Sequence, residues 1–461
     1  MPAKFSLLII LYGIITGDCK TSLLRHDDNN QNWSVNKVVE RKNELYSTNS
    51  HVFAESIPLL SSRNDILKLG RLHHEHIHEV TIAIRPKNMD EVTRVLHDIS
   101  HPSSSNYGKH WTREEIVDFT SNSEAYVAVV SYLRSRGASV VSETLAREFI
   151  TVRAPIKVLE TIFNTEFYIF HQTQDRGNVN KVVRAEKYWI PRELEPHIQS
   201  VFGVIDLPTK LNGGGIKLST KSVAMSDSNG PWIDDAGITP HKLRSYYNMS
   251  DSIMGSNFST QAVYASGTAF YSPADILHFQ NIAGLPHQVI RDVGNRSTNS
   301  ECLKDSFNCF ESHLDLQYIT AMSPESPTTH WFTTVWLSSW LLEIYNAVDL
   351  PRVLSITYTS DEKWTSAGDL EAFDTIAIKL GMMGVTIFAA SGDNGANAAL
   401  AENDPSKCGY EPQFPSVSSY VTSIGATSVS NFIVQCYHVT FSWKFSLLLY
   451  ICFLGIDLLF Q

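Results

Sequence analysis

Val353-Leu-Ser-Ile-Thr-Tyr358 is a largely apolar run, and Val385-Thr-Ile-Phe-Ala-Ala390 is a second one. Strands that are covered on both faces of a sheet have this continuous apolar character. Between the two runs, Asp369 to Met383 is predicted to form a crossover helix. A strand, a helix and a second strand in this order predict a right-handed βαβ unit in a parallel sheet. The second run leads into Ser391-Gly-Asp-Asn-Gly395, at the carboxyl end of its strand, where functional sites of such sheets gather.

The same α/β pattern begins earlier, from Gly237 onward. Gln261 to Ala265 is predicted as a strand, and the next helix begins near Ser272-Pro273. Serine is a preferred helix cap and proline is favoured at the first helical position, so this pair marks a helix start. We therefore expect an α/β fold in the second half of the chain.

The preceding residues, from Glu79 to Leu207, alternate between strand and helix patterns. Val80 to Ile84 has the period of two that a half-buried strand requires. Helices are predicted over 89–99 and 123–135, and further strands over 140–145, 149–152 and 167–170. These elements predict a compact α+β domain with mostly antiparallel strands.

Composition narrows the class of protein. The chain has 461 residues, of which 43% are hydrophobic and 18% are charged, as in packed globular proteins. At about 150 residues per domain, this length allows roughly three domains. Thirty-seven Lys and Arg residues against 48 Asp and Glu residues give a formal net charge of −11. Nucleic acid is not an expected partner, because its binding requires a surplus of basic residues.

The first 19 residues have the pattern of a secretory signal peptide. Lys4 supplies a basic start, and Phe5 to Ile15 form an apolar stretch that is too short to span a bilayer. A buried N-terminal strand is the alternative interpretation. Glycosylation motifs of the form Asn-x-Ser agree with secretion, and they begin at Asn32, Asn248, Asn257 and Asn295.

Three of the six cysteines lie in the apparent folded body of the chain, since Cys19 adjoins the signal peptide and two others lie in the C-terminal tail. Cys302 and Cys309 are close enough in sequence to close a local disulfide loop. This pairing leaves Cys408 without a partner in the folded body.

One acidic segment is a candidate for general-base chemistry. In Phe310-Glu-Ser-His-Leu-Asp-Leu-Gln-Tyr-Ile319, Glu311 and Asp315 are four residues apart, so on a helix they lie on one face. Asn308 is predicted to cap this helix, with Glu311 completing a capping box. A buried carboxyl pair tends to share a proton and suits general-base work. The alternative is a solvated acidic turn.

The second candidate is Ser391-Gly-Asp393, directly after a predicted strand. An acid on a glycine-flanked turn at the carboxyl end of a strand is well placed to meet a substrate. The alternative is an ordinary turn, because Gly, Asp and Asn are the residues that turns use.

These segments occur in a characteristic order. The Glu311 and Asp315 helix is followed by Ser391-Gly-Asp393 and then by Phe414-Pro-Ser-Val-Ser-Ser-Tyr-Val-Thr-Ser-Ile-Gly-Ala-Thr-Ser428. In this order they resemble the sedolisin family of serine-carboxyl peptidases, in particular its lysosomal tripeptidyl-peptidase branch. His101-Pro-Ser-Ser-Ser-Asn-Tyr-Gly-Lys-His-Trp-Thr112 resembles the family's activation prodomain, and Gly237-Ile-Thr-Pro-His-Lys-Leu-Arg-Ser-Tyr-Tyr-Asn248 resembles the start of its mature enzyme. The resemblance runs from about Glu79 to Ser430.

The resemblance implies a subtilisin-like α/β catalytic domain with a parallel sheet, incomplete in this sequence, preceded by an α+β activation prodomain. It implies Glu311 as the general base, Asp315 as its orienting partner and Asp393 as a protonated oxyanion-hole acid. A carboxyl group donates a hydrogen bond only when protonated, so this set suits an acidic compartment. The substrate-binding residues that it implies are Ser355, Tyr358, Ser391 and Gly392. Thr359-Ser360 depart from the Gly-Asp that is usual in the tripeptidyl branch.

The family's nucleophile lies in a downstream Ser-Gly-Thr-Ser motif, and its calcium loop follows later. This sequence contains neither, so we assign no metal ligand. Ser266-Gly-Thr-Ala269 is similar but precedes the base, and Ser428 belongs to the strand before the expected site. The resemblance ends near Ser430. Phe445 to Ile456 is apolar but short for a membrane span, and read-through or an alternative splice end is preferred over a tail anchor.

We predict the following segments: signal peptide 1–19, polar N-terminal segment 20–65, activation prodomain 66–207, linker with a processing site 208–235, partial sedolisin peptidase domain 236–430 and aberrant apolar tail 431–461. The linker is rich in Gly, Ser, Lys and Asp, which is typical of exposed, cleavable chain.

We therefore expect the precursor of an acid peptidase whose substrates are peptides or unfolded proteins and whose own prodomain inhibits it. The expected location is the secretory pathway, the lysosome or the extracellular space, and no membrane partner is expected. Calcium is expected only in the complete family protein. Without the nucleophile, the chain alone is expected to be inactive. The alternatives are a catalytically dead binding or inhibitory protein and a tail-anchored ectodomain.

His73-His-Glu-His-Ile-His78 is a further unusual segment. In an extended strand, His74, His76 and His78 would share one face. A solvated polar strand is preferred over a metal site. We also predict that protonation of these histidines at about pH 5–6 weakens prodomain docking.

Overall fold

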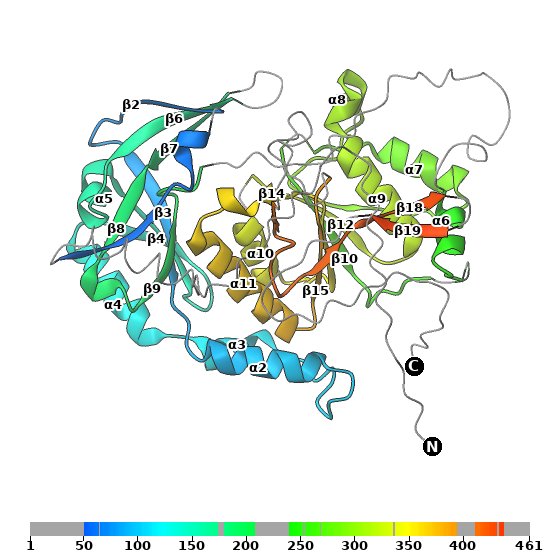
Figure 1. The fold of residues 1–461 in the computed structure, drawn as a ribbon, viewed down its shortest axis with the longest axis horizontal. Coiled ribbons are helices and arrows are strands. Elements are labelled where there is room, and N and C mark those ends of the chain that lie inside the picture. The colour runs from blue at the N-terminus through cyan, green and yellow to red at the C-terminus, as the bar shows by residue number, and fades with distance from the viewer. Residues whose placement is uncertain are drawn as a thin grey trace, which may run out of the picture.

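The computed structural model describes residues 50–207, 239–393, 411–430 and 433–437, except 64, 174–178, 251, 253, 268, 335 and 336. The predicted signal peptide, the predicted linker over 208–235, Asn32, Cys408 and the apolar stretch over 445–456 lie outside the described residues. We call residues 50–207 the N-terminal part and residues 239–437 the C-terminal part (Figure 1).

The N-terminal part is built on antiparallel strands. Its central sheet has the order β4-β5-β3-β9, a second sheet has the order β2-β6-β7, and β1 pairs with β8. The strands are β1 (His51–Ser56), β2 (Ile66–Arg71), β3 (Ile77–Ile84), β4 (Ser139–Glu143), β5 (Phe149–Pro155), β6 (Phe167–Thr173), β7 (Val179–Ala185), β8 (Lys187–Pro191) and β9 (Ile198–Phe202). All of these pairs are antiparallel, so the predicted α+β domain is confirmed.

The helices of this part are α2 (Met89–Ser100), α3 (Arg113–Thr120), α4 (Ser123–Ser135) and α5 (Ile156–Ile162), with short 3-10 turns at Leu60–Ser62 and Arg192–Leu194. Local sequence explains their ends. The Thr112 side chain accepts from the Glu115 backbone N–H, and the Glu115 carboxylate accepts from that of Thr112, which forms a capping box. Asn122 caps α4 in the same way through its side-chain oxygen.

The C-terminal part contains a six-stranded parallel sheet in the order β11-β12-β10-β13-β15-β17. Its strands are β10 (Gln261–Ala265), β11 (Arg291–Val293), β12 (Thr328–Phe332), β13 (Val353–Ile356), β15 (Thr386–Ala390) and β17 (Thr422–Ile424). Two small antiparallel pairs flank it, β14 (Ser360–Asp361) with β16 (Gln413–Phe414) and β18 (Ala426–Ser430) with β19 (Ile433–Tyr437). The predicted α/β class with a parallel sheet is confirmed.

Helices cover both faces of the parallel sheet (Figure 1). They are α6 (Pro240–Tyr246), α7 (Pro273–Ile282), α8 (Asn299–Lys304), α9 (Phe310–Met322), α10 (Leu337–Asn346) and α11 (Ala367–Met382), with 3-10 turns η4 (Ser306–Asn308) and η5 (Glu362–Trp364). Neighbouring residues of β10 show how the faces divide, because side chains alternate along a strand. Val263 packs with Ile276 of α7 and Leu316 of α9, whereas Tyr264 packs with Trp340 of α10.

The two parts contact each other through α11. Ala83 and Phe149 of the N-terminal part join the core cluster that α10 and α11 form with the parallel sheet. The backbone N–H of Trp111 donates to the Met382 carbonyl, with 2.9 Å between N and O. None of the helices in the described ranges combines the length and the apolar character that a membrane crossing requires.

The end of the predicted polar N-terminal segment over 20–65 forms β1, where Phe53 packs edge-to-face on Trp189 with ring centroids 5.6 Å apart. The start of the predicted tail over 431–461 forms β19, which pairs with β18. The proposed segment boundaries stay predictions. Two other sequence predictions are wrong. Asn308 does not cap α9, because it lies in η4 and the helix begins one residue after Cys309.

The second wrong prediction is a shared histidine face. His73 and His74 stack in a turn before β3, and only His78 lies in the strand. The His78 Nε2 lies 2.8 Å from the Gly203 carbonyl oxygen. The contacts that the structure describes for these histidines stay within the N-terminal part, so they do not support a role in docking.

Candidate active site

Helix α9 carries two acidic side chains on one face. Ser312, Leu316 and Thr320 are buried and hold the helix against the sheet. Glu311 and Asp315 are one turn apart on this helix, and both are half-buried. The helix is thus a rigid carrier that keeps two carboxyl groups close together.

Thr357, at the carboxyl end of β13, connects this pair to the sheet. Its hydroxyl donates to Asp315, with 3.0 Å between Oγ1 and Oδ2. Burial raises the pKa of Asp315 well above its usual range, and the charge of Glu311 raises it further. Burial also raises the pKa of Glu311, Thr357 lowers it, and the charge of Asp393 raises it. The pair therefore keeps a proton at a pH where exposed carboxyl groups have lost theirs.

Asp393 approaches the same place from the end of β15. The chain turns there at Gly392, whose φ of 90° favours glycine. A side chain at Gly392 would also meet Gln413, because an added Cβ would lie 2.9 Å from its Cγ. Ser391 is buried, and its backbone N–H donates to the Ile424 carbonyl. The structure thus brings Asp393 within electrostatic range of Glu311, from an element 82 residues further along the chain.

Aromatic side chains border the acids. Tyr358 lies close enough to Glu311 and Asp315 for their charges to raise its pKa, in addition to the larger effect of burial. Its ring packs edge-to-face on Tyr264 with centroids 5.5 Å apart, and Tyr264 packs on Trp340 at 5.0 Å. The apolar rings lower the local dielectric constant, which strengthens the coupling between the carboxyl groups.

The remaining predicted substrate residues lie in different positions. Ser391 and Gly392 belong to the turn that carries Asp393. Ser355 lies inside β13, where its backbone pairs with Val263 and Phe388. Within the part of the chain that the structure describes, no side-chain hydrogen bond links Ser355 to the acids.

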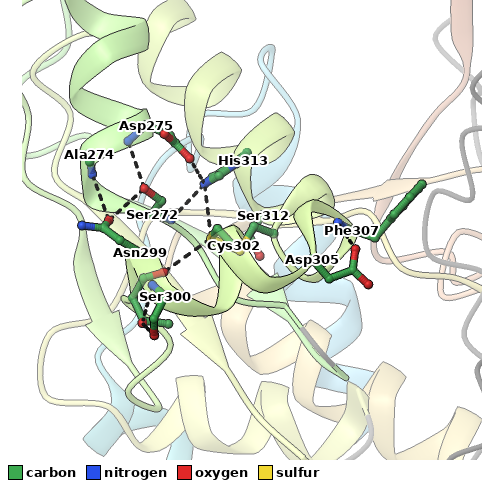
Figure 2. The surroundings of a disulfide bond; sticks show 12 residues. Ser272, Ala274, Asp275, Asn299, Ser300, Cys302, Asp305, Phe307, Ser312 and His313 are labelled. Atoms are coloured by element: carbon green, nitrogen blue, oxygen red, sulfur yellow. Dashed lines mark hydrogen bonds and ion pairs between the residues drawn. A yellow bond between two sulfur atoms is a disulfide. The ribbon is translucent and has the colours of Figure 1, made fainter.

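A disulfide joins Cys302 of α8 to Cys309, directly before α9, with 5.5 Å between the Cα atoms. Figure 2 shows the Cys302 side chain pointing toward His313 of α9, which also faces Ser272 and Asp275 of α7. The Ser272 backbone N–H donates to the His313 Nε2 over 2.9 Å. This cluster ties the start of the acid-bearing helix to the loop before it.

The residues around this disulfide also form a cluster of potential metal ligands. Among the described residues, Cys302, Cys309 and His313 are the set whose ligand atoms gather within 4.8 Å of one another. Calcium prefers six to eight oxygen ligands, and here the cysteines are joined in a disulfide. These residues do not fit calcium, and the calcium site implied by the family resemblance stays a prediction.

The three glycosylation motifs in the described residues are accessible. Asn248, Asn257 and Asn295 are exposed in turns. An exposed asparagine side chain is accessible to modification.

The structure also reveals polar residues that the sequence did not single out. Thr357 lies in a run that reads as an apolar strand, so only its place at the strand's carboxyl end could have drawn attention to it. Glu343 of α10 accepts from the Trp331 indole N–H, with 3.1 Å between Oε2 and Nε1. No spacing motif joins Glu343 to the acids of α9.

Comparisons with known proteins agree with this architecture. Residues 64–207 match the family model described as the pro-kumamolisin activation domain. Tripeptidyl-peptidase 1 of Homo sapiens is 27% identical over 379 residues, which cover 78% of this chain and 63% of that protein. Physarolisin of Physarum polycephalum is 28% identical over 400 residues, which cover 81% of this chain and 64% of that protein. The chain thus spans less than two thirds of the length of these relatives.

Among solved structures, Pseudomonas sedolisin, a serine-carboxyl proteinase complexed with two molecules of pseudo-iodotyrostatin, is 18% identical. The match covers 42% of this chain and 55% of that chain with a TM-score of 0.33. The chain is thus similar to tripeptidyl-peptidase 1 and to physarolisin, and its residues 64–207 match the activation domain of the pro-kumamolisin model.

Proposed function

We propose that the chain is the precursor of an acid serine-carboxyl peptidase. The observation that carries this proposal is the half-buried Glu311 and Asp315 pair, one turn apart on α9, with Asp393 in electrostatic range. Three carboxyl groups that converge at one edge of a parallel sheet, two of them with raised pKa values, are typical of a catalytic site.

In this proposal each acid has a distinct task. Glu311 accepts the proton of a serine hydroxyl as that oxygen attacks the peptide carbonyl, and later returns it to the leaving amine. Asp315, held by Thr357, orients Glu311 and shares its proton. Protonated Asp393 donates a hydrogen bond to the oxyanion that forms on the carbonyl oxygen. We assign no residue of this chain as the nucleophile, and we expect the chain by itself not to hydrolyse peptides.

Peptides are the proposed substrates, bound along the turn at Ser391 and Gly392 and beside Tyr358. We further propose that the peptidase releases N-terminal tripeptides, by analogy with tripeptidyl-peptidase 1. Thr359 and Ser360 bear on it, because both are buried and the Thr359 hydroxyl donates to the Gln413 side chain over 3.2 Å. Neither offers a charge to the amino end of a peptide, so endopeptidase action is equally compatible with this edge of the site.

The N-terminal part is the proposed intramolecular inhibitor. Its contacts with α11 support this role, since α11 leads through β15 to Asp393. Acidic compartments of the secretory pathway, the lysosome above all, are the proposed location, because the oxyanion donor must be protonated and a carboxylate base still accepts protons at mildly acidic pH.

Hydrolysis assays on matched proteins test the proposal. The purified chain should leave an unblocked tripeptide fluorophore intact at every pH. The product of a transcript that continues through a Ser-Gly-Thr-Ser motif should cleave it near pH 4–5. In that product, Glu311→Gln and Asp393→Asn should each lower kcat by about a hundredfold or more. Unchanged kcat in both variants would reject the assigned roles.

A further inference from the structure

Arg296 has an unusual environment. It follows β11 after a turn at Gly294 and Asn295, which have φ values of 104° and 57°. Its guanidinium carbon lies 3.6 Å from the ring centroid of Phe332 and 4.5 Å from that of Phe270. Two aromatic rings therefore hold the side chain in place through cation–π contacts.

The guanidinium group has no anionic partner within the described residues. Its Nε atom is buried and donates no hydrogen bond. No carboxylate oxygen in the described ranges lies within ion-pair distance of it. The nearby Asp292 is already engaged, because its Oδ2 accepts from the backbone N–H groups of Arg296 and Ser297.

The lowered pKa of Arg296 agrees with a positive charge that lacks an anionic partner. Burial lowers the pKa of Arg296, and the charge of Asp292 only partly offsets this effect. The other carboxylate oxygen of Asp292 lies 3.6 Å from the Nδ1 of the buried His330, which makes it a poor partner for arginine. A cation that loses solvent without gaining an anion is poised to bind one.

Arg296 also lies at the same edge of the sheet as the acids. Phe332 is the last residue of β12, and the next backbone N–H, that of Thr333, donates to the Ala265 carbonyl at the end of β10. The Phe270 backbone N–H donates to the Asn308 carbonyl, just before α9 begins. The two rings that hold Arg296 therefore come from the carboxyl ends of the strands and from the approach to Glu311.

We infer that Arg296 forms a carboxylate-binding subsite for a peptide bound beside Glu311. The planar guanidinium group, which contacts both rings, carries outer N–H groups of the kind that a carboxylate can accept in two parallel hydrogen bonds. The carboxylate is either an acidic side chain of the peptide or its C-terminal group. This inference rests on the proposed function, because it names a subsite of that same edge.

Peptide binding, rather than hydrolysis, tests the inference. Isothermal titration calorimetry of the purified full chain at pH 6 would compare three sets of hexapeptides of alanine and phenylalanine. The first set carries one aspartate at each position in turn and an amidated C-terminus. The second set carries asparagine instead, and the third carries asparagine with a free C-terminal carboxylate.

The expected result is that a carboxylate in at least one position improves the Kd by about tenfold or more over the asparagine peptide, as charge-assisted hydrogen bonds should. The first and third sets separate an acidic side chain from the C-terminal group. Equal Kd values in all three sets, or no binding of any peptide, would overturn the inference. This experiment measures binding and not hydrolysis. A failure of the Arg296 inference can therefore be distinguished from a failure of the proposed peptidase function.

Three variants locate the effect. Arg296→Gln should abolish the preference for carboxylate, and Arg296→Lys should keep part of it, because lysine retains the charge but not the planar fork. Arg136→Gln is the matched control, since Arg136 also lies over an aromatic ring, that of Tyr132 at 5.0 Å, but in the N-terminal part. Thermal unfolding of each variant verifies that it is folded. A preference for carboxylate peptides that persists in Arg296→Gln would contradict the subsite. An equal fall in affinity in Arg296→Lys and Arg136→Gln would also contradict it.

Discussion

Lys379 of α11 donates a hydrogen bond to Glu148, which lies 231 residues earlier in the chain, and both side chains are buried. The Thr120 hydroxyl donates to the same carboxylate over 3.1 Å. This pair joins the activation domain to the helix that precedes Asp393. Because the charges are removed from water, each depends on the other for compensation.

Removal of one member of this pair should therefore be costly. Lys379→Met should lower the free energy of unfolding by about 3–5 kcal/mol, because it leaves Glu148 charged and buried. The double variant Lys379→Met with Glu148→Leu should lose less than Lys379→Met alone. Urea unfolding followed by tryptophan fluorescence measures both. A double variant as unstable as the sum of the two single variants would show that the side chains do not interact.

Glu55 makes a second connection between the two parts. Its carboxylate accepts from the Gly368 backbone N–H over 2.8 Å, at the start of α11. Burial raises the pKa of Glu55 to about 6, against an ordinary value of 4.5. A raised pKa contributes stability that is fully present below about pH 4.5 and is lost as the pH rises through about 6.

Glu55→Gln should remove this pH dependence. The rise in pKa from 4.5 to about 6 corresponds to about 2 kcal/mol of unfolding free energy. Between pH 4.5 and pH 7 the wild type should lose this contribution, whereas Glu55→Gln should not. Denaturant unfolding across this range measures the difference. Glu195→Gln is the control, because Glu195 is exposed. Parallel pH profiles for wild type and Glu55→Gln would contradict the assignment.

Local patterns in the sequence were sufficient to predict several elements of the fold. The run at 385–390 forms β15, and the helix predicted over 123–135 has the same bounds in α4. Both depend on side-chain periodicity and on caps within a few residues, such as Asn122. Glu311 and Asp315 could also be predicted as neighbours, since one helical turn separates them.

Contacts between distant segments could not be predicted in this way. No spacing relates Lys379 to Glu148, or Arg296 to the two rings that hold it, because each contact depends on how separate elements pack. Asn308 had a favourable sequence for a cap, but it lies in the 3-10 turn η4, and α9 begins two residues later at Phe310. The turn that precedes the helix depends on contacts that a capping pattern does not encode.

The Cys302 to Cys309 disulfide should stabilise the start of α9. A loop of this length restricts the unfolded chain by about 2–3 kcal/mol. The double variant Cys302→Ser with Cys309→Ser should lose about that much free energy of unfolding. It should also show faster amide hydrogen exchange over 299–313 than the wild type. Unchanged exchange in this segment would mean that the His313 contacts alone hold the helix start.

The two acids of α9 should titrate as a pair. Since the charge of Glu311 raises the pKa of Asp315, Glu311→Gln should lower it. The variant should therefore lose less stability than the wild type as the pH rises toward neutrality. Carboxyl carbon NMR of protein labelled at aspartate would follow Asp315 directly. An identical pKa of Asp315 in both proteins would show that Glu311 and Asp315 do not interact electrostatically.

The most direct test of the account asks whether Asp393 shares a site with Glu311. Carboxyl carbon NMR of glutamate-labelled protein would follow Glu311, identified by the resonance that disappears in Glu311→Gln. The charge of Asp393 raises the pKa of Glu311, so Asp393→Asn should lower that pKa. Asp118→Asn, at an exposed position of α3, should leave it unchanged. An identical pKa of Glu311 in the wild type and in Asp393→Asn would contradict a common site and, with it, the proposed peptidase mechanism.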